Sequence, residues 1–201
     1  TPYLIIDAEM ENTLKYTAKR GVDVCMILPG IADNIPAHAL AKSHYRALTE
    51  AGVKIYEYLP GFIHAKEFIV DGQKAVVGSI NLDYRSLYLN FECGIFLYQN
   101  NVISDMEKDF QNTLRRSLNI TMEDYKKLPL HVKLTGSMLR FIAPLSKLSL
   151  KNIKNAGTSD FSSLCQHFLC LFYATSIKCM AFFILCYGYY MHDIIYPMLW
   201  V

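Results

Sequence analysis

Short apolar runs alternate with longer stretches of helical periodicity through the first half of the chain. The runs at Tyr3–Ile6, Val22–Leu28 and Val53–Leu59 are bounded by turn residues, so each predicts a buried strand. The stretches between them repeat apolar residues at intervals of three and four, which predicts amphipathic helices. This alternation indicates an α/β fold, with one mixed β-sheet sandwiched between helices.

Capping residues mark the ends of the first two predicted helices. Asp7 precedes the first helix, and Gly21 ends it. Pro36 begins the second, and Gly52 ends it. His44 lies on the apolar stripe of the second helix, where a packing residue is more common than a ligand. We therefore predict no site at this histidine.

Two alternating runs on either side of an Asp-Gly pair predict a β-hairpin over residues 64–81. Two loops are open at this point, and they differ in strand register. A loop at residues 72–73 sets Lys66 opposite Ser79, whereas a loop at residues 71–72 sets His64 opposite Ser79. Both registers gather an imidazole, an ammonium, a hydroxyl and a carboxamide on one patch. These groups belong to His64, Lys66, Ser79 and Asn81.

This patch suits nucleophilic attack on a phosphorus centre without a metal. A neutral imidazole is a competent nucleophile near neutral pH, and the other groups of the patch donate hydrogen bonds to phosphate oxygens. Gly78 lowers the steric bulk beside the patch, as a closely approaching ligand requires. The alternative is an amphipathic hairpin whose polar face meets only solvent. The joint spacing of several such residues favours the chemical interpretation.

The pattern HxKxxxxD followed by GSxNxDxRS resembles the motif of the phospholipase D superfamily. The flanking sequence is similar to the C-terminal half of bacterial cardiolipin synthases as far as about Leu145. The matching residues are His64, Lys66, Asp71, Gly78, Ser79, Asn81, Asp83, Arg85 and Ser86.

The resemblance implies a phosphatidyltransferase that joins two phosphatidylglycerol molecules through a phosphohistidine intermediate, with no cofactor. It also implies a carboxylate, Glu92, that holds the nucleophilic histidine in one tautomer. Asp83 and Arg85 are expected to brace the loop rather than to react. The expected site residues are His64, Lys66, Asp71, Ser79, Asn81 and Glu92.

The motif occurs once, whereas the resemblance implies two motifs in each chain. Of the other five histidines, only His131 has a Lys two residues later, and it lacks the Asp of the motif because position 138 is Met. A complete site is therefore expected to need either a missing N-terminal half or a homodimer partner. The absence of an initiator Met before Thr1 likewise suggests a fragment or a cut product.

Composition narrows the functional classes only a little. A charged share of 19% and a net charge of +2 are typical of a globular protein, and we expect no nucleic-acid partner. The six cysteines form no C-x-x-C pair and no His-Cys cluster with metal-ligand spacing, so we expect no metal site.

The sequence divides into three parts. Residues 1–128 are the predicted phospholipase D-like catalytic half-domain, and residues 129–160 form a basic, amphipathic segment near the membrane. This segment either lies on an anionic bilayer or is a helix docked on the domain with a solvated basic face. Residues 161–201 are an apolar tail, interrupted by Lys178, that is either a transmembrane segment or foreign to the family. A spanning tail would place the catalytic part on the cytoplasmic side of a bacterial cell membrane.

Three functions follow from these observations. The first is the phosphatidyltransferase acting on a phospholipid substrate at a membrane surface. The second is a phospholipase D-type phosphodiesterase hydrolase, in which water replaces the lipid acceptor. The third is an inactive, truncated fragment that associates with membranes. The products formed from phosphatidylglycerol distinguish among them.

Overall fold

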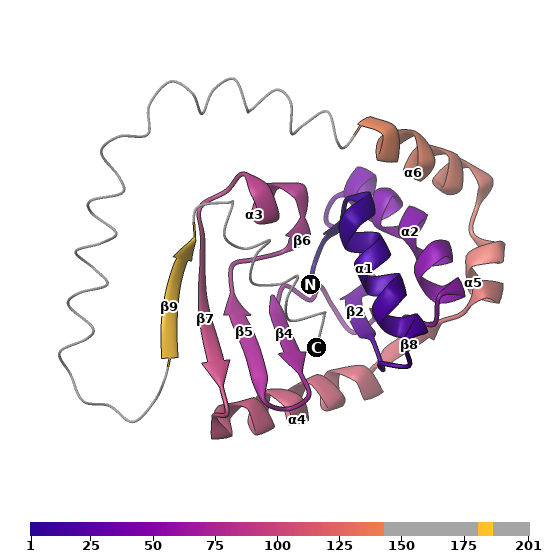
Figure 1. The fold of residues 1–201 in the computed structure, drawn as a ribbon. Helices are drawn as coiled ribbons and strands as arrows, with labels where there is room; N and C mark the ends of the chain where they lie inside the picture. Colours follow the sequence, from indigo (N-terminus) through magenta and orange to yellow (C-terminus); the bar gives the residue numbers. More distant parts are fainter. Residues whose placement is uncertain (143–180, 187–201) are drawn as a thin grey trace, which may run out of the picture.

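The computed structural model describes residues 1–142 and 181–186, and it confirms the predicted mixed α/β architecture (Figure 1). The strands are β1 (Leu4–Ile5), β2 (Cys25–Pro29), β3 (Lys54–Tyr58), β4 (Glu67–Val70), β5 (Lys74–Gly78), β6 (Leu82–Asp83), β7 (Glu92–Tyr98), β8 (Ser117–Ile120) and β9 (Ala181–Cys186). The helices are α1 (Ala8–Lys19), α2 (Ile35–Glu50), α3 (Tyr84–Tyr88), α4 (Asn101–Arg115), α5 (Met122–Lys127) and α6 (Leu130–Ile142).

The described strands form three sheets rather than the single mixed sheet that we predicted. One sheet has the order β2-β3-β8, with β2 and β3 parallel and β8 antiparallel to β3. A second, antiparallel sheet has the order β4-β5-β7-β9. A short parallel ribbon joins β1 to β6. The expectation of one continuous sheet was wrong because β2 and β4 do not pair with each other.

The helix starts follow the capping residues. The Asp7 carboxylate accepts a hydrogen bond from the Met10 amide at 2.8 Å and caps α1. Asn34 caps α2 in the same way, so this helix begins one residue before Pro36. Gly21 has a φ of 94°, a left-handed conformation that glycine adopts without strain and that lets the chain leave α1.

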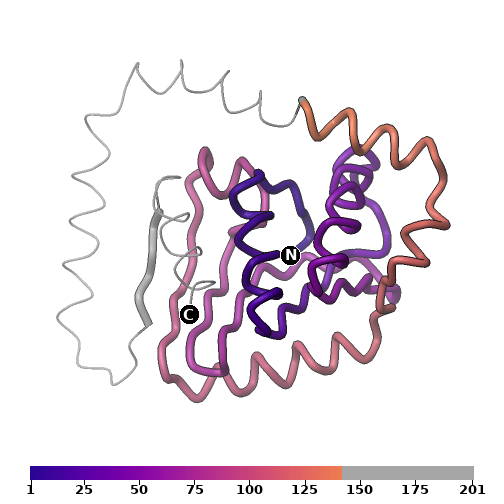
Figure 2. Tube along the Cα trace, turned by 45° about the vertical axis from the view of Figure 1, so that its right-hand side comes forward, coloured from indigo at the N-terminus to yellow at the C-terminus, as the bar shows by residue number. Residues whose placement is uncertain are grey.

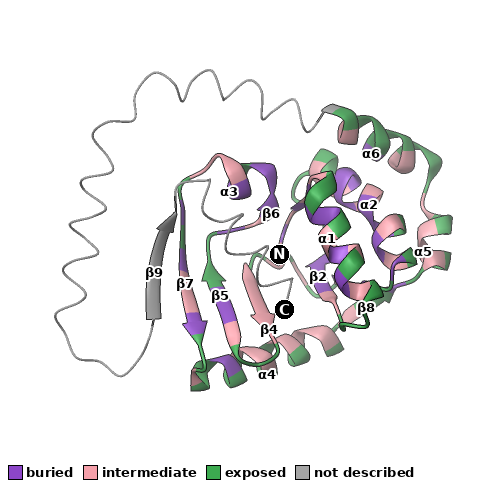
Figure 3. Ribbon diagram, viewed as in Figure 1, coloured by how far each residue is buried: buried purple, intermediate pink, exposed green. Residues whose placement is uncertain are grey.

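The main core lies between α1, α2 and the strands of both larger sheets. Figure 3 shows the buried residues concentrated on β2 and on the inner faces of α1 and α2, whereas α4 and α6 expose most of their residues. A smaller apolar cluster on the other face of β5 packs under α4. The largest fully buried side chains of the main cluster include Leu4, Met10, Leu28, Tyr45, Leu48 and Ile55.

The sequence pattern missed β8 and α5, and it left α6 between two interpretations. α6 packs against α2, where a Cβ at Gly136 would lie 2.4 Å from the carbonyl oxygen of Ala39. The start of the basic segment is therefore a helix docked on the domain. The remainder of that segment, and all of the predicted tail except β9, lie outside the described residues. No described helix is both long and apolar enough to cross a bilayer.

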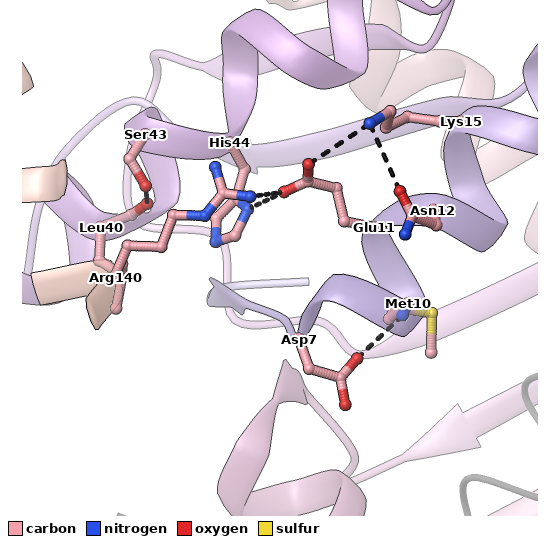
Figure 4. A network of polar contacts seen from close by, with 9 residues as sticks. All are labelled: Asp7, Met10, Glu11, Asn12, Lys15, Leu40, Ser43, His44 and Arg140. Carbon is pink, nitrogen blue, oxygen red and sulfur yellow. Dashed lines mark hydrogen bonds and ion pairs between the residues drawn. The ribbon is translucent and has the colours of Figure 1, made fainter. Parts of the chain in front are cut away.

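A buried ion-pair cluster ties α6 to α1 and α2 (Figure 4). The Glu11 carboxylate accepts hydrogen bonds from Arg140 of α6 and lies 2.7 Å from Nδ1 of His44. Lys15 approaches its other oxygen at 3.7 Å. His44 is only 1% exposed, so the prediction of a packing residue is confirmed. Burial acts to raise the pKa of Glu11, but His44, Arg140 and Lys15 outweigh it and hold that pKa below its ordinary value.

We predict that Glu11→Gln lowers the free energy of unfolding by about 2 kcal/mol at neutral pH, because the buried carboxylate shared by His44, Arg140 and Lys15 is lost. Urea titration of both proteins measures this difference. The same titration on Glu50→Gln is the control, since Glu50 pairs with Arg46 on the surface and its loss should cost about 0.5 kcal/mol.

The pH dependence of this difference follows from the direction of the pKa shift. A carboxylate with a lowered pKa stabilises the folded state above its ordinary pKa of about 4.3, and this contribution is lost as the pH falls through the folded pKa. The gap between wild type and E11Q should therefore narrow below about pH 4.3. A constant gap down to the acid transition would contradict the role of the Glu11 charge.

Candidate active site

The hairpin of β4 and β5 has a register midway between the two that we predicted. Val70 pairs with Lys74, so the loop contains three residues and Lys66 lies opposite Gly78. Asp71 and Gly72 have φ values of 51° and 62°, and the Gln73 amide donates to Val70 at 3.0 Å. The Gln73 carbonyl accepts a hydrogen bond from the loop after β7 and so extends the β5–β7 ladder. Both predicted two-residue loops were wrong because Asp71 and Gly72 take left-handed conformations and Gln73 joins the turn through its bond to Val70.

Ser79 lies against β7 rather than against β4. Its amide donates to the carbonyl oxygen of Cys93 at 2.8 Å, and the Cys93 amide donates back to the Ser79 hydroxyl oxygen at 2.9 Å. The Ser79 hydroxyl also donates to the Glu92 carboxylate. These bonds fix the hydroxyl at the end of the hairpin where β5 stops and β7 begins.

Gly78 is required by the backbone of the neighbouring strand. A Cβ at Gly78 would lie 2.2 Å from the Cys93 carbonyl oxygen and 2.6 Å from the Gly94 Cα. We predicted that this glycine makes room for a ligand; the structure shows instead that it makes room for β7. The close approach brings Ser79 within bonding distance of Glu92.

Glu92 is a buried carboxylate with two described hydrogen-bond donors. Ser79 donates to one oxygen, and the Asn90 amide group donates to the other at 3.2 Å. The structure describes no hydrogen bond between Glu92 and His64, so the expected clamp on the histidine is not formed among the described contacts. Asn90 was missed by the sequence reasoning; its position two residues before Glu92 was the available signal.

Lys66 lies beside these acidic groups, with its ammonium donating to the His64 carbonyl oxygen at 2.7 Å. Burial lowers the pKa of Lys66, and the negative charges of Glu92 and Asp83 act in the opposite direction. The ammonium is therefore partly desolvated and set in the field of two buried carboxylates. A cation in this state interacts more strongly with a phosphate than a fully hydrated one does.

The remaining polar groups differ in how they are held. The His64 ring is exposed and packs beside Phe62, with 5.6 Å between ring centroids. The Asn81 side-chain oxygen and the Ser86 hydroxyl are buried, and neither has a hydrogen-bond partner among the described residues. Buried polar atoms without partners are uncommon, and a bound ligand would satisfy such a group.

Asp71 and Asp83 lie at opposite ends of the hairpin. Figure 1 shows the hairpin turn that contains Asp71 at the end of β4 nearest α4, whereas α3 lies at the opposite end. Asp71 is thus roughly 15 Å along the strand from Lys66 and is not gathered with the other predicted residues. Asp83 caps α3 by accepting from the Ser86 amide at 2.7 Å, and it forms no described ion pair with Arg85.

The site therefore consists of the side chains at one end of the hairpin. Among residues 1–142 and 181–186, no three His, Cys, Asp or Glu side chains are arranged to hold a metal ion. The groups present are an exposed imidazole, a partly buried ammonium, a hydroxyl, a carboxamide and a buried carboxylate. This combination supplies a nucleophile together with hydrogen-bond donors for an oxyanion.

Comparison with known proteins identifies the family. Residues 1–114 match the family described as "Cardiolipin synthase, PLD-like domain", and this range includes the whole hairpin. The chain belongs to this family. The phospholipase D resemblance predicted from the His-Lys-Asp motif is thereby confirmed.

Bacterial proteins are among the relatives of this phospholipase D-like chain. It is 52% identical to an uncharacterized protein of Streptococcus mutans, a match that covers 72% of this chain and 32% of that protein. It is 39% identical to cardiolipin synthase 2 of Bacillus anthracis, over 72% of this chain and 28% of the synthase. The chain thus spans about a third of the length of the curated relatives that it matches.

A solved structure supports the phospholipase D-like fold. A phospholipase D family member, Nuc, from Salmonella typhimurium aligns with a TM-score of 0.51 and 19% sequence identity. The alignment covers 60% of this chain and 78% of that one. At this level of identity the likeness concerns the fold alone.

We predict that Gly78→Ala destabilises the protein by about 3 kcal/mol, because the added methyl group meets the Cys93 carbonyl. This value is at the upper end of the usual cost of adding a methyl group to a packed site. Thermal unfolding measures the effect. Gly61→Ala is the control, since a Cβ there meets nothing within 4 Å and should change stability by no more than about 0.5 kcal/mol. Equal effects of the two substitutions would contradict the close approach of β5 and β7.

Proposed function

We propose that this chain supplies one half of the active site of a cardiolipin synthase-type phosphatidyltransferase. The observation that carries the proposal is the position of Lys66, Ser79 and Glu92 at one end of the hairpin, next to the exposed His64. Membership of the cardiolipin synthase family supports phosphatidylglycerol as the substrate.

The proposed reaction has two steps. The His64 imidazole attacks the phosphorus of one phosphatidylglycerol; a P–N bond forms, the P–O bond to glycerol breaks, and glycerol leaves with a proton. The free glycerol hydroxyl of a second phosphatidylglycerol then attacks the phosphohistidine. Its proton returns to a base and cardiolipin is formed. The sum is two phosphatidylglycerol molecules giving one cardiolipin and one glycerol.

In this proposal each remaining site residue has a role set by its surroundings. Lys66, Ser79 and Asn81 stabilise the charge that develops on the non-bridging phosphate oxygens. Glu92 is a positioning residue, since its buried carboxylate accepts the Ser79 hydrogen bond and its charge acts on Lys66. Asp71 acts at a distance by shaping the hairpin turn.

The second imidazole, which protonates the leaving alcohol, comes from outside this half. The described part holds three other histidines: His38 of α2 lines a small cavity beside Pro29, His44 bonds to Glu11, and His131 is exposed on α6. We therefore propose that the complete site forms with another phospholipase D-like half, either in a longer chain or in a second copy.

The substrate is a lipid, and we propose that α6 holds the domain on the bilayer surface. Four apolar residues, at intervals of four, four and three, form one exposed stripe on this helix, and Phe141 is 85% exposed. Lys126, Lys127 and Lys133 lie near the start of the stripe and favour anionic lipids. The stripe consists of Leu130, Leu134, Met138 and Phe141.

This proposal places the domain on the cytoplasmic surface of a bacterial membrane. The anionic leaflet there attracts basic residues, each of which contributes about 1 kcal/mol near the surface. The docking of α6 on α2 leaves the stripe free to contact lipid, because the helix uses the surface around Gly136 and Arg140 to contact the domain.

We predict that the protein, as a homodimer or with an added second half, forms cardiolipin and glycerol from phosphatidylglycerol in mixed micelles. His64→Ala should reduce the rate by about three orders of magnitude or more, because the nucleophile is lost. His131→Ala is the matched control and should retain wild-type turnover. Lipid products are separated by thin-layer chromatography and glycerol is measured enzymatically.

The products decide among the three functions. Phosphatidic acid in place of cardiolipin would identify water as the acceptor and favour the hydrolase. A monomer that gives neither product, alone and with an added second half, would favour the inactive fragment and contradict the proposal.

We predict that Leu134→Glu weakens binding to vesicles rich in phosphatidylglycerol by about tenfold or more, because it places a charge within the apolar stripe. Vesicle sedimentation measures the bound fraction. Leu118→Glu is the control: Leu118 of β8 is 51% exposed and Leu134 is 56% exposed, so the two substitutions differ mainly in location. Equal binding by both variants would argue against α6 as the lipid-contacting surface.

A further inference from the structure

Two strand edges face each other across one cavity. β2 is the terminal strand of its sheet and β4 is the terminal strand of the other, and each pairs on one side only. A cavity of about 500 Å³ lies between them, lined by Cys25–Ile27 of β2 and by all four residues of β4. Edge strands present unpaired N–H and C=O groups, which are costly when they are not exposed to water.

The backbone groups that face this cavity follow from the ladders. The Lys54 amide donates to the Val24 carbonyl, so alternate residues of β2, beginning with Cys25, direct their backbone groups away from β3. The Gly78 amide donates to the Lys66 carbonyl, so Glu67 and Ile69 direct theirs away from β5. No described residue donates a hydrogen bond to the backbone oxygens of Cys25, Glu67 or Ile69.

The first residues of the chain lie at the edge of β2 that faces this cavity. The Thr1 amino group donates to the Ile27 carbonyl oxygen at 3.2 Å, on the edge of β2 that faces away from β3. Pro2 and Tyr3 line a small cavity together with Leu28 and Pro29, which follow Ile27 on β2, so the first three residues run in the same direction as β2. Figures 1 and 2 both place the N-terminus inside the fold rather than on its rim.

The charge of Thr1 does not suit this environment. The amino group is buried, and burial lowers its pKa to about 6, although the nearby Glu67 carboxylate acts to raise it. A neutral peptide N–H at the same place would make the same hydrogen bond to Ile27 without the desolvation cost of an ammonium.

The walls of the cavity define the chemistry of an occupant. Leu14 of α1 lies among the lining residues, as does Phe110 of α4. A strand between β2 and β4 would have helices over its faces as well as a strand on each side. Because strands buried on both faces are continuous apolar runs, the occupant should be apolar. The acidic residues of the lining suit an occupant without negative charge; they are Asp23, Glu67, Asp71, Glu107 and Asp109.

We propose that the gap between β2 and β4 is a strand position, and that its occupant is an extended apolar segment continuing the backbone upstream of Thr1. This segment runs parallel to β2 and antiparallel to β4, and it joins the two sheets into one. The chain spans only about a third of its curated relatives, which leaves ample polypeptide for such a segment.

The inserted strand also bears on the active site, although the inference does not depend on the reaction. Lys66 directly precedes β4, whose outer edge has no described strand beside it. Pairing of Glu67 and Ile69 with a neighbour would hold that strand, and hence Lys66, against the fold. The position is therefore a point at which upstream sequence stabilises the catalytic hairpin.

The test extends the full chain upstream of Thr1 by about five alternating Val and Ile residues, a common strand length. The control extension has the same length but proline at every second position, which removes the donors that a ladder needs. Amide hydrogen exchange is followed by mass spectrometry in both proteins and in the unextended chain. We expect the Val-Ile extension to slow exchange at Cys25, Ile27, Glu67 and Ile69 by about tenfold or more and to raise the melting temperature.

The proline extension should leave exchange at these amides unchanged, and β8 should exchange equally in all three proteins. Equal exchange in the two extended proteins would overturn the proposal. Strong protection in the unextended chain would also overturn it: protection lost on dilution would assign the position to a second copy, and protection independent of concentration would assign it to the chain's own residues. Lipid turnover does not enter any of these outcomes, so a failed reaction and a failed strand position are distinguishable.

Discussion

The close approach of β5 and β7 at Gly78 is the constraint on which the site depends. Because Gly78 has no Cβ, the Cys93 carbonyl reaches the backbone beside it, and Ser79 then bonds to both Cys93 and Glu92. The buried Glu92 charge acts in turn on the Lys66 ammonium across the end of the hairpin. One steric condition between two strands thus positions a hydroxyl, a carboxylate and an ammonium together.

A second set of contacts holds the surface that we assign to the membrane. Glu11 joins α1, α2 and α6 through His44 and Arg140, so the polar side of α6 is fixed on the domain while its apolar stripe remains exposed. None of the residues of this cluster belongs to the hairpin of β4 and β5. The proposed function therefore assigns binding to lipid and chemistry to different elements that share one core.

Local sequence predicted much of the fold and only part of the site geometry. Capping by Asp7 and the apolar runs of β2 and β3 are local signals, and the structure confirms them. The hairpin register was missed because the Asp-Gly pair fits a two-residue loop as well as the three-residue loop that forms, in which Asp71 and Gly72 both have a positive φ. The hydrogen-bond partners of Glu92 were also missed. The family resemblance identifies the carboxylate, but only the folded structure shows that Ser79 and Asn90 reach it. The strands form separate sheets because β2 and β4 do not pair with each other or with a described strand between them. No local sequence pattern predicts this break.

The proposed mechanism requires a covalent bond between His64 and phosphorus, and capture of this phosphohistidine tests it. The protein is mixed with phosphatidylglycerol, quenched within milliseconds, kept above neutral pH to preserve the P–N bond, digested and analysed by mass spectrometry. We expect a phosphatidyl adduct on the peptide that contains His64, and no adduct in the His64→Ala variant. Turnover to cardiolipin in a variant that lacks His64, or an adduct on another residue, would rule out His64 as the nucleophile.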